Sequence, residues 1–334
     1  MYLGQLKAKV TIADKYVLNG VHSCEIKRSV HQIVQTAKIE LPLSVVMQNY
    51  DLRKQINLSG LIKEGDSIKI EAGYDNVTRL EFEGYIKRIN YTIPLSIECE
   101  DELYLFRKMN FKKSFNDAPL KDIIQYIIDE LKKQMGLQLE VYKGMPEFPF
   151  KNFLMKNGNG IDVLQELKDK YGLNSYLISV DGVKTLYVGL MYGYKTTNVK
   201  YVFNRNTIAT SDLKYNGFEN RRYKATIKNF NPDGTTTTLE TGDKDGEQTN
   251  VYWFGSHTID ELRHFAEAQI QMFGMPGYKG SIDTFLTPYV EPGMIANLSD
   301  PQFPDRDGNH YVGTVTTTIG SGGGRRKPEV DFKV

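Results

Sequence analysis

One pattern occurs twice in this 334-residue chain, as IKEGDSIKI at residues 62–70 followed by FEGYI at 82–86, and as VEPGMIANL at 290–298 followed by YVGTV at 311–315. Each copy consists of a glycine turn, a strand, a connecting segment, and a second strand with an aromatic residue two positions before a glycine. The turn glycine precedes the strand glycine by a similar distance in both copies. Self-similarity of this kind indicates a duplicated structural unit.

The four glycines of this repeat have expected structural roles. Gly65 and Gly293 stand in turns that favour positive φ, and Gly84 and Gly313 stand where a barrel wall bends or another backbone approaches closely. One turn-strand-turn-strand segment is generic in β proteins. Two copies in the same order, each late in its own β-rich block, favour a duplicated β-barrel. We therefore predict that Gly65 is equivalent to Gly293 and Gly84 to Gly313.

The residues around the repeat predict a mainly β fold with α+β insertions. The chain has 21 Tyr and 16 Phe but one Trp, and such aromatic residues, with the frequent Val, Ile and Thr, suit pleated surfaces. Short alternating segments fill the chain from Lys7 to Glu100 and return from about Asn198. We expect three domains: a first β-barrel (1–109), a middle α+β domain (110–200), and a second, similar β-barrel (201–334) with an inserted helix at about 257–274.

Local signals place the helices of the middle domain. An apolar pattern at three-and-four spacing follows Asp117, which we expect to be the N-cap of a first helix. A second helix is expected over 161–171, with Gly172 as its C-cap. Near the C-terminus, the glycine-rich segment 320–324 is expected to form the tip of a hairpin.

Charge and cysteine content exclude several classes of protein. Lys and Arg total 42 and Asp and Glu total 41, giving a net charge of +1, so no net field attracts nucleic acid or anionic lipid. Cys24 and Cys99 are too few for a disulfide framework or a four-thiolate zinc site. The N-terminus lacks a signal-peptide pattern, and no stretch approaches the ~20 apolar residues of a membrane span. We expect a soluble protein without sequence-specific nucleic-acid recognition.

Residue types that perform catalysis or bind metals occur without the partners they need. Glu261 and His264 have the spacing of a di-iron carboxylate motif, which requires a second copy and further glutamates. Glu98 and Glu100 fall on one face of a strand, which we expect to be exposed, with Cys99 in the core. We therefore predict no catalytic, cofactor-binding or metal-binding residues.

Several short motifs also match a known family in order and spacing. They are Gly65-Asp66, Gly73-Tyr74, Phe82–Ile86 and Cys99-Glu100-Asp101 in the first β block, Gly160–Leu167 with Lys170–Leu173 in the middle, and Pro292-Gly293 with Asp307–Val312 near the end. In this arrangement the chain resembles the phage late control gene D proteins. These are baseplate hub proteins related to the N-terminal half of the VgrG spike proteins of type VI secretion.

The resemblance implies a structural protein and a set of partners. Hub proteins of this kind form homotrimers in which each subunit contributes two similar barrels to a pseudo-sixfold ring, because a closed interface with a hexameric ring needs six equivalent surfaces from three chains. The ring joins a sixfold tail tube protein to a threefold spike. The chain ends at Val334 without a β-helix, so we expect the spike to be a separate protein. Other baseplate proteins are further implied partners, and the implied location is the virion tail, assembled in the cytoplasm of a bacterial host.

Two alternatives remain open at this point. A tail-associated cell-wall hydrolase would need a cleft with perturbed carboxylates, whereas the acidic residues here fall mostly at turns and on exposed strand faces. A tail-tip protein of a non-contractile phage would share the β-rich pattern. The sequence also leaves open whether the machine is a contractile phage tail, a secretion system or another injection system. We expect a protein without enzymatic activity.

Overall fold

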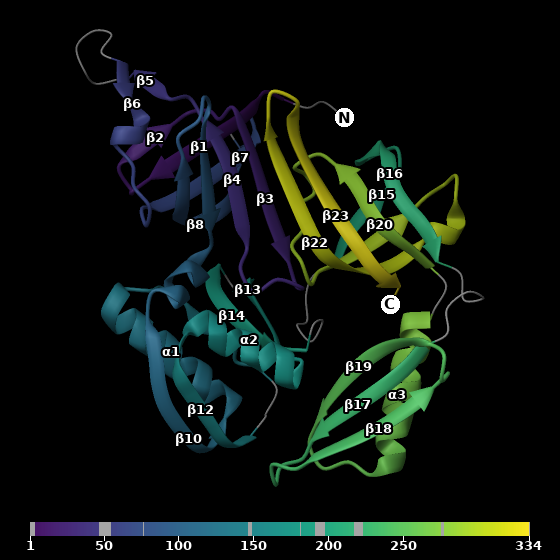
Figure 1. The fold of residues 1–334 in the computed structure, drawn as a ribbon. Coiled ribbons are helices and arrows are strands. Elements are labelled where there is room, and N and C mark those ends of the chain that lie inside the picture. The colour runs from purple at the N-terminus through teal and green to yellow at the C-terminus, as the bar shows by residue number, and fades with distance from the viewer. Residues whose placement is uncertain are drawn as a thin grey trace.

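The computed structural model describes residues 4–46, 55–75, 77–145, 149–180, 182–190, 198–216, 223–274 and 277–333. Figure 1 shows strands at both ends of the chain and helices between them. The strands are β1 (Leu6–Ile12), β2 (Tyr16–Leu18), β3 (Ser23–Ser29), β4 (Thr36–Leu41), β5 (Ser44–Val46), β6 (Gln55–Asn57), β7 (Ser67–Tyr74), β8 (Val77–Asn90), β9 (Leu95–Glu100), β10 (Asn110–Pro119), β11 (Glu140–Val141), β12 (Pro149–Asn159), β13 (Asn174–Val180), β14 (Val183–Gly189), β15 (Asn198–Val202), β16 (Thr207–Asn216), β17 (Tyr223–Phe230), β18 (Thr236–Gly242), β19 (Glu247–Phe254), β20 (Gly277–Thr284), β21 (Ile295–Ser299), β22 (Gly308–Gly320) and β23 (Gly323–Lys333). The α-helices are α1 (Leu120–Met135), α2 (Gly160–Tyr171) and α3 (Ile259–Gly274). The mainly β fold with helical insertions is confirmed.

One sheet connects the two ends of the chain. Its strand order is β16-β20-β23-β22-β3-β4-β9-β8-β7-β1-β2, and β21 pairs with both β22 and β15. We call β1, β3, β4, β7, β8 and β9 the first β unit, and β15, β16 and β20–β23 the second β unit. We expected two similar barrels, and the sheet passes from one β unit into the other without a break because β3 pairs with β22.

The two β units arrange their corresponding strands in the same order. The first pairs its strands in the order β1-β7-β8-β9-β4-β3, and the second in the order β15-β21-β22-β23-β20-β16. The corresponding strands also follow one another in the same order along the chain. One orientation differs, because β1 is antiparallel to β7 while β15 is parallel to β21. Agreement in both orders is what a duplication predicts.

The second β unit contains a larger insertion than the helix expected at about 257–274. Between β16 and β20, strands β17, β18 and β19 form a separate sheet, and α3 packs on it (Figure 1). The insertion has a small hydrophobic core that is separate from the other cores. It consists of Ala225, Ile227, Val251, Leu262 and Ala266. The strands stay outside the main sheet because their apolar residues face this helix.

The middle region combines a two-stranded ribbon, a three-stranded sheet and two helices. β10 pairs with β12, and β13 and β11 both pair with β14. α1 begins after Pro119, and Asp117 lies within β10 with φ near +50° and contacts Lys151, so the predicted N-cap is wrong. Gly172 ends α2 with φ near +66°, as predicted. β15 begins at Asn198, inside the range expected for the middle domain, and pairs with β21.

Candidate interaction surface at the junction of the two β units

Strands β3 and β22 form the junction between the two β units. They are antiparallel, with register from Ser29 opposite Thr314 to Ser23 opposite Gly320. The buried Ser29 and Thr314 hydroxyl oxygens lie 2.9 Å apart and form a hydrogen bond at one end. At the other end, the turn between β22 and β23 pairs Gly320 with Gly323, which confirms the predicted hairpin tip.

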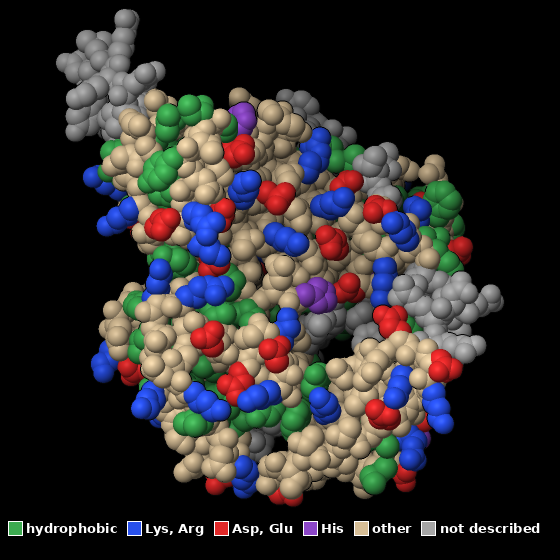
Figure 2. Space-filling view, in the orientation of Figure 1, with side chains coloured by type: hydrophobic (Ala, Val, Ile, Leu, Met, Phe, Trp, Pro, Cys, Tyr) green, Lys and Arg blue, Asp and Glu red, His purple; other side chains and the backbone are tan. Residues whose placement is uncertain are grey.

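Charged side chains cross the exposed face of this junction in a row. Arg325, Thr318, Glu25, Lys38 and Glu98 are successive neighbours on β23, β22, β3, β4 and β9. Figure 2 shows positive and negative side chains interspersed over this part of the molecule. Because the signs alternate, the face has little net field and does not suit the polyanionic backbone of nucleic acid.

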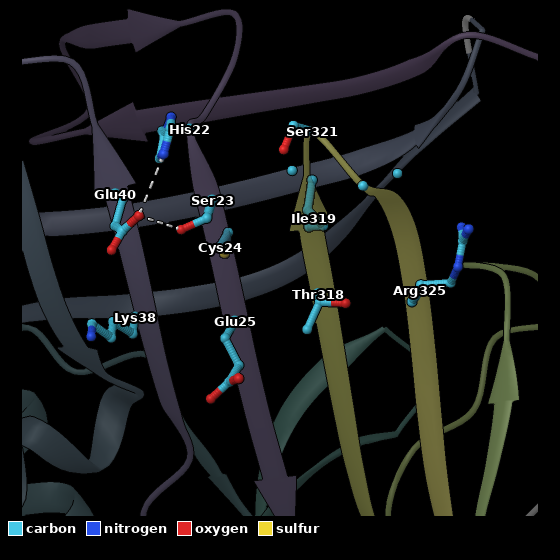
Figure 3. A pocket seen from close by; sticks show the side chains of 13 residues that line it. His22, Ser23, Cys24, Glu25, Lys38, Glu40, Thr318, Ile319, Ser321 and Arg325 are labelled. Carbon is cyan, nitrogen blue, oxygen red and sulfur yellow. Dashed lines mark hydrogen bonds and ion pairs between the residues drawn. The ribbon is translucent and has the colours of Figure 1, made fainter. Parts of the chain in front are cut away.

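A groove of about 490 Å³ lies on the same face, beside the β22–β23 turn. In Figure 3, His22, Ser23 and Glu40 lie on one side of it and Ser321 and Arg325 on the other. The Ser23 hydroxyl donates a hydrogen bond to Glu40 Oε2 at 2.8 Å, and His22 Nε2 is 3.9 Å from the same oxygen. Both β units supply its lining, so the groove exists only because β3 and β22 are paired.

A buried ion pair connects the units on the opposite face of the sheet. Arg326 follows Arg325 on β23 and points the other way, as strand alternation requires. Its Nη2 donates to Glu81 Oε1 at 2.6 Å and to Oε2 at 2.5 Å, and its Nη1 donates to the carbonyl of Leu286. The Arg326 and Glu81 side chains are only 1% and 3% exposed. Glu81 lies on β8, so this ion pair joins the two units directly.

Tyr289 lies among three arginines next to this pair. Arg28 Nη1 donates to the Tyr289 hydroxyl at 2.8 Å, and the Arg79 and Arg326 guanidinium carbons lie 3.3 Å and 4.7 Å from the centre of its ring. These distances fit cation–π contacts. Burial raises the pKa of the Tyr289 hydroxyl above its ordinary value. The cluster adds polar and aromatic contacts to the junction.

The hydrophobic cores of the two units are not equivalent at this junction. The core of the first β unit includes Leu286 and Ile319, both contributed by the second unit. Within the described parts of the chain, the core of the second unit is built only from residues between Val199 and Val330. The first unit therefore has a neighbour whose side chains complete its core, and the described residues of the chain provide no such neighbour for the second unit.

The turn glycines of the repeat have matching geometry. Gly65 has φ near +92° and its N–H donates to the carbonyl of Ile86 at 2.8 Å. Gly293 has φ near +88° and its N–H donates to the carbonyl of Val312 at 2.7 Å. In each copy the carbonyl of the next residue accepts the return bond at 2.9 Å. The positive φ explains the choice of glycine at both positions.

The strand glycines do not match in register. Tyr85 and Tyr311 each pair with the residue two positions after their turn glycine. Gly84 precedes Tyr85 and therefore corresponds to His310. This register contradicts our prediction that Gly84 is equivalent to Gly313. β21 and β22 pair without a bulge, and the copies differ because Tyr85 lies 20 residues after Gly65 whereas Tyr311 lies 18 residues after Gly293. Similar spacing of the glycines in the sequence therefore does not make them equivalent in strand pairing.

The acidic run around β9 is structural but less exposed than expected. Glu98 is half-buried, but Glu100 is 2% exposed, so the predicted exposed position is wrong for Glu100. Lys87 and Arg107 compensate its charge, at 2.6 Å and 3.0 Å from its two oxygens. Asp101 is buried and caps the following 3-10 helix, and burial raises its pKa.

Of the two candidate metal residues of α3, Glu261 caps the helix N-terminus, and His264 lies exposed with its Nδ1 3.9 Å from Glu267 Oε2. Glu261 Oε2 accepts from the Thr258 N–H at 2.8 Å, and the Thr258 hydroxyl accepts from the Glu261 N–H at 3.3 Å. This is a capping box. Over the described ranges, no group of three or more His, Cys, Asp or Glu side chains is placed to hold a metal ion. The same ranges contain no helix long and apolar enough to cross a membrane.

Comparison with known proteins identifies the fold. Neither the known family models nor the curated proteins match this sequence. Among solved structures, the 43 kDa tail protein of prophage MuSo2 from Shewanella oneidensis matches with a TM-score of 0.60 at 15% identity, covering 97% of each chain. A tail protein from Neisseria meningitidis MC58 matches with a TM-score of 0.62 at 12% identity, covering 97% of this chain and 96% of that one.

A third match is the E. coli c3393 protein, described as a component of the type VI secretion system with structural similarity to the T4 tail proteins gp27 and gp5. Its TM-score is 0.59 at 9% identity, and the match covers 98% of this chain and 77% of that chain. The present chain therefore has, over nearly its whole length, a fold found in phage tail proteins and in a type VI secretion component. This is the fold that the sequence resemblance implied.

Proposed function

We propose that this protein is the structural baseplate hub of a contractile phage tail or a related injection machine. In this proposal three copies form a ring of six β units that joins a sixfold tail tube to a threefold spike. The observation that carries the proposal is the β3–β22 junction, which shows how one β unit pairs with the next. The tail-protein fold supports the same assignment.

The chain also has the two free strand edges that a second junction of this kind needs. β16 holds the place of β3 in the second unit, and in the described residues it pairs only with β20. β8 holds the place of β22 in the first unit. Beyond Ile86, β8 pairs with β9 on one edge, and no described strand pairs with the other. Pairing of β16 in one copy with β8 in the next would repeat the β3–β22 junction between chains.

Repetition of one junction within and between chains leads to a closed ring. Each chain supplies two units, so the ring contains an even number of them, and three chains supply the six that a hexameric tube protein can bind. Closure also covers strand edges that would otherwise expose unpaired backbone groups. The tube protein and a separate spike protein would occupy opposite faces of the ring, beside other baseplate proteins of the virion.

The carboxylates support a structural role without enzymatic activity. A hydrolase would need a carboxylate with a perturbed pKa in an accessible cleft. Three of the described buried glutamates instead contact cations: Glu81 contacts Arg326, Glu100 contacts Lys87 and Arg107, and Glu102 contacts Lys184. Each of them therefore belongs to an ion pair that holds strands or segments together.

The mass of the assembled complex tests this proposal. The full chain would be purified with the tube protein encoded beside it and measured by native mass spectrometry and light scattering. We expect three 38.1 kDa chains for every ring of tube protein. A dimer or tetramer of this chain in that complex would contradict the proposal, because neither supplies six β units.

A further inference from the structure

The turn between β8 and β9 exposes two large apolar side chains. Tyr91 is 73% exposed and Ile93 is 85% exposed. The turn is nevertheless ordered by hydrogen bonds, because the Thr92 N–H donates to the carbonyl of Asn90 at 2.9 Å and the Thr92 hydroxyl donates to the carbonyl of Pro94 at 2.7 Å. An ordered turn that presents apolar side chains loses little conformational entropy on binding, which suits an interface.

The other β unit contains a buried counterpart of Ile93. Tyr85 and Tyr311 are equivalent in register, and Ile93 lies eight residues after Tyr85 as Ile319 lies eight residues after Tyr311. Ile319 precedes the β22–β23 turn, is opposite Cys24 of β3, and is only 2% exposed. It belongs to the core of the first β unit. Ile319 is a strand residue that a neighbouring unit covers, whereas Ile93 lies in the turn beyond the end of β8 and is exposed.

We infer that Ile93, with Tyr91 beside it, packs into the second β unit of a neighbouring copy of this chain, as Ile319 packs into the first β unit within the chain. This inference rests on the proposed ring and names the side chains that hold its chains together. The occupant of the surface is a second copy because the chain itself contains the same contact between its two units.

The second β unit has a suitable surface at its free edge. No side chain from the first unit enters its described core, in contrast to the core of the first unit. β16 forms that free edge, and its Tyr215 is 60% exposed. If β16 pairs with β8 as β3 pairs with β22, the start of β16 near Thr207 meets the β8–β9 turn, and Tyr215 meets the middle of β8.

The β22–β23 and β8–β9 turns differ in composition, and the difference fits the kind of junction at which each turn lies. The β22–β23 turn consists of glycine and serine, and its junction is formed by units already joined in one chain. The β8–β9 turn would form a junction between separate chains, which must also offset the loss of translational and rotational freedom. Two large apolar side chains provide that additional driving force.

Substitution of Ile93 tests the inference in the full chain with the tube protein. We expect Ile93→Asp to reduce the population of trimer seen by native mass spectrometry by about tenfold or more. The circular dichroism and the urea midpoint of the monomer should stay unchanged. Leu154→Asp is the matched control, because Leu154 is 49% exposed on the β10–β12 ribbon, and we expect it to leave the trimer intact.

A photo-crosslink identifies the contact directly. Benzoylphenylalanine in place of Tyr91 is expected to crosslink to peptides of residues 198–216 or 277–330 from a second, isotopically labelled copy. Crosslinks to the tube or spike protein, or a trimer unaffected by Ile93→Asp, would overturn the inference and leave the proposed ring standing. Absence of a trimer in the unsubstituted protein would overturn both.

Discussion

Replacement of Arg326 by Met tests whether the ion pair between the β units stabilises their junction. Arg326 makes three hydrogen bonds, two to the Glu81 carboxylate and one to the Leu286 carbonyl, at a site where both side chains are almost fully buried. Met keeps much of the side-chain volume but leaves the Glu81 carboxylate buried without its cation. Removal of one partner of a buried pair costs about 3–5 kcal/mol, so we expect a loss of this size in the free energy of unfolding.

Equilibrium unfolding in urea, followed by circular dichroism and tyrosine fluorescence, measures this loss. The control is Lys170→Met, which breaks the exposed pair of Lys170 and Glu166, with side chains 58% and 32% exposed. Exposed pairs at this helical spacing contribute about 0.3–0.5 kcal/mol, so the control should barely move the transition. The double variant Glu81→Leu with Arg326→Met should recover most of the stability, since apolar replacement of a whole buried pair is often neutral.

The location of the pair gives a second measurable consequence. Arg326 lies on β23 and Glu81 on β8, so the substitution weakens a contact between units while leaving each unit's own strands intact. We expect the transitions followed by the two probes to coincide in the unsubstituted protein and to separate in Arg326→Met. A loss below about 1 kcal/mol, or an equal loss in the double variant, would refute the view that charge compensation at this site stabilises the junction.

Three further predictions concern single residues. His310 is buried, its ring nitrogens have no hydrogen-bond partner among the described residues, and burial lowers its pKa. Its contribution to stability is therefore present at neutral pH and is lost as pH falls below the usual histidine pKa of about 6.5. His310→Leu should flatten the pH dependence of the urea midpoint between about pH 7 and pH 5, and a profile as steep as that of the unsubstituted protein would contradict this. A Cβ at Gly84 would collide with the backbone of Glu100, whereas one at Gly65, where φ is positive, would only come into ordinary contact with the Tyr104 hydroxyl at 3.7 Å. Gly84→Ala should therefore cost about 3 kcal/mol and Gly65→Ala about 1–2 kcal/mol in urea unfolding, and the reverse order would be evidence against the close approach. Burial raises the pKa of Cys24 to about 12 and that of Cys99 still further. Neither thiol should therefore react with an aromatic disulfide reagent at pH 8 until denaturant is added, and rapid reaction of the native protein would show that the thiols are accessible.

The sequence was sufficient where structure follows from near neighbours in the chain. The end of α2 was predictable because Gly172 follows an apolar three-and-four pattern, and a C-cap glycine acts within one turn. The turn glycines Gly65 and Gly293 were predictable because each stands in a short turn motif, and the duplication was visible because those motifs recur in the same order. The mainly β class followed from alternation and composition, which act over a few residues.

Tertiary structure decided the features that depend on residues far apart in sequence. Gly84 is aligned with His310 by the pairing of β7 with β8 and of β21 with β22, and the exposed position predicted for Glu100 was wrong because Lys87 and Arg107 cover it from other segments. The junction itself brings β3 to β22 and Glu81 to Arg326, 245 residues apart. Pairing partners, burial and charge compensation of this kind are set by which surfaces meet in space, and local periodicity contains no information about that choice.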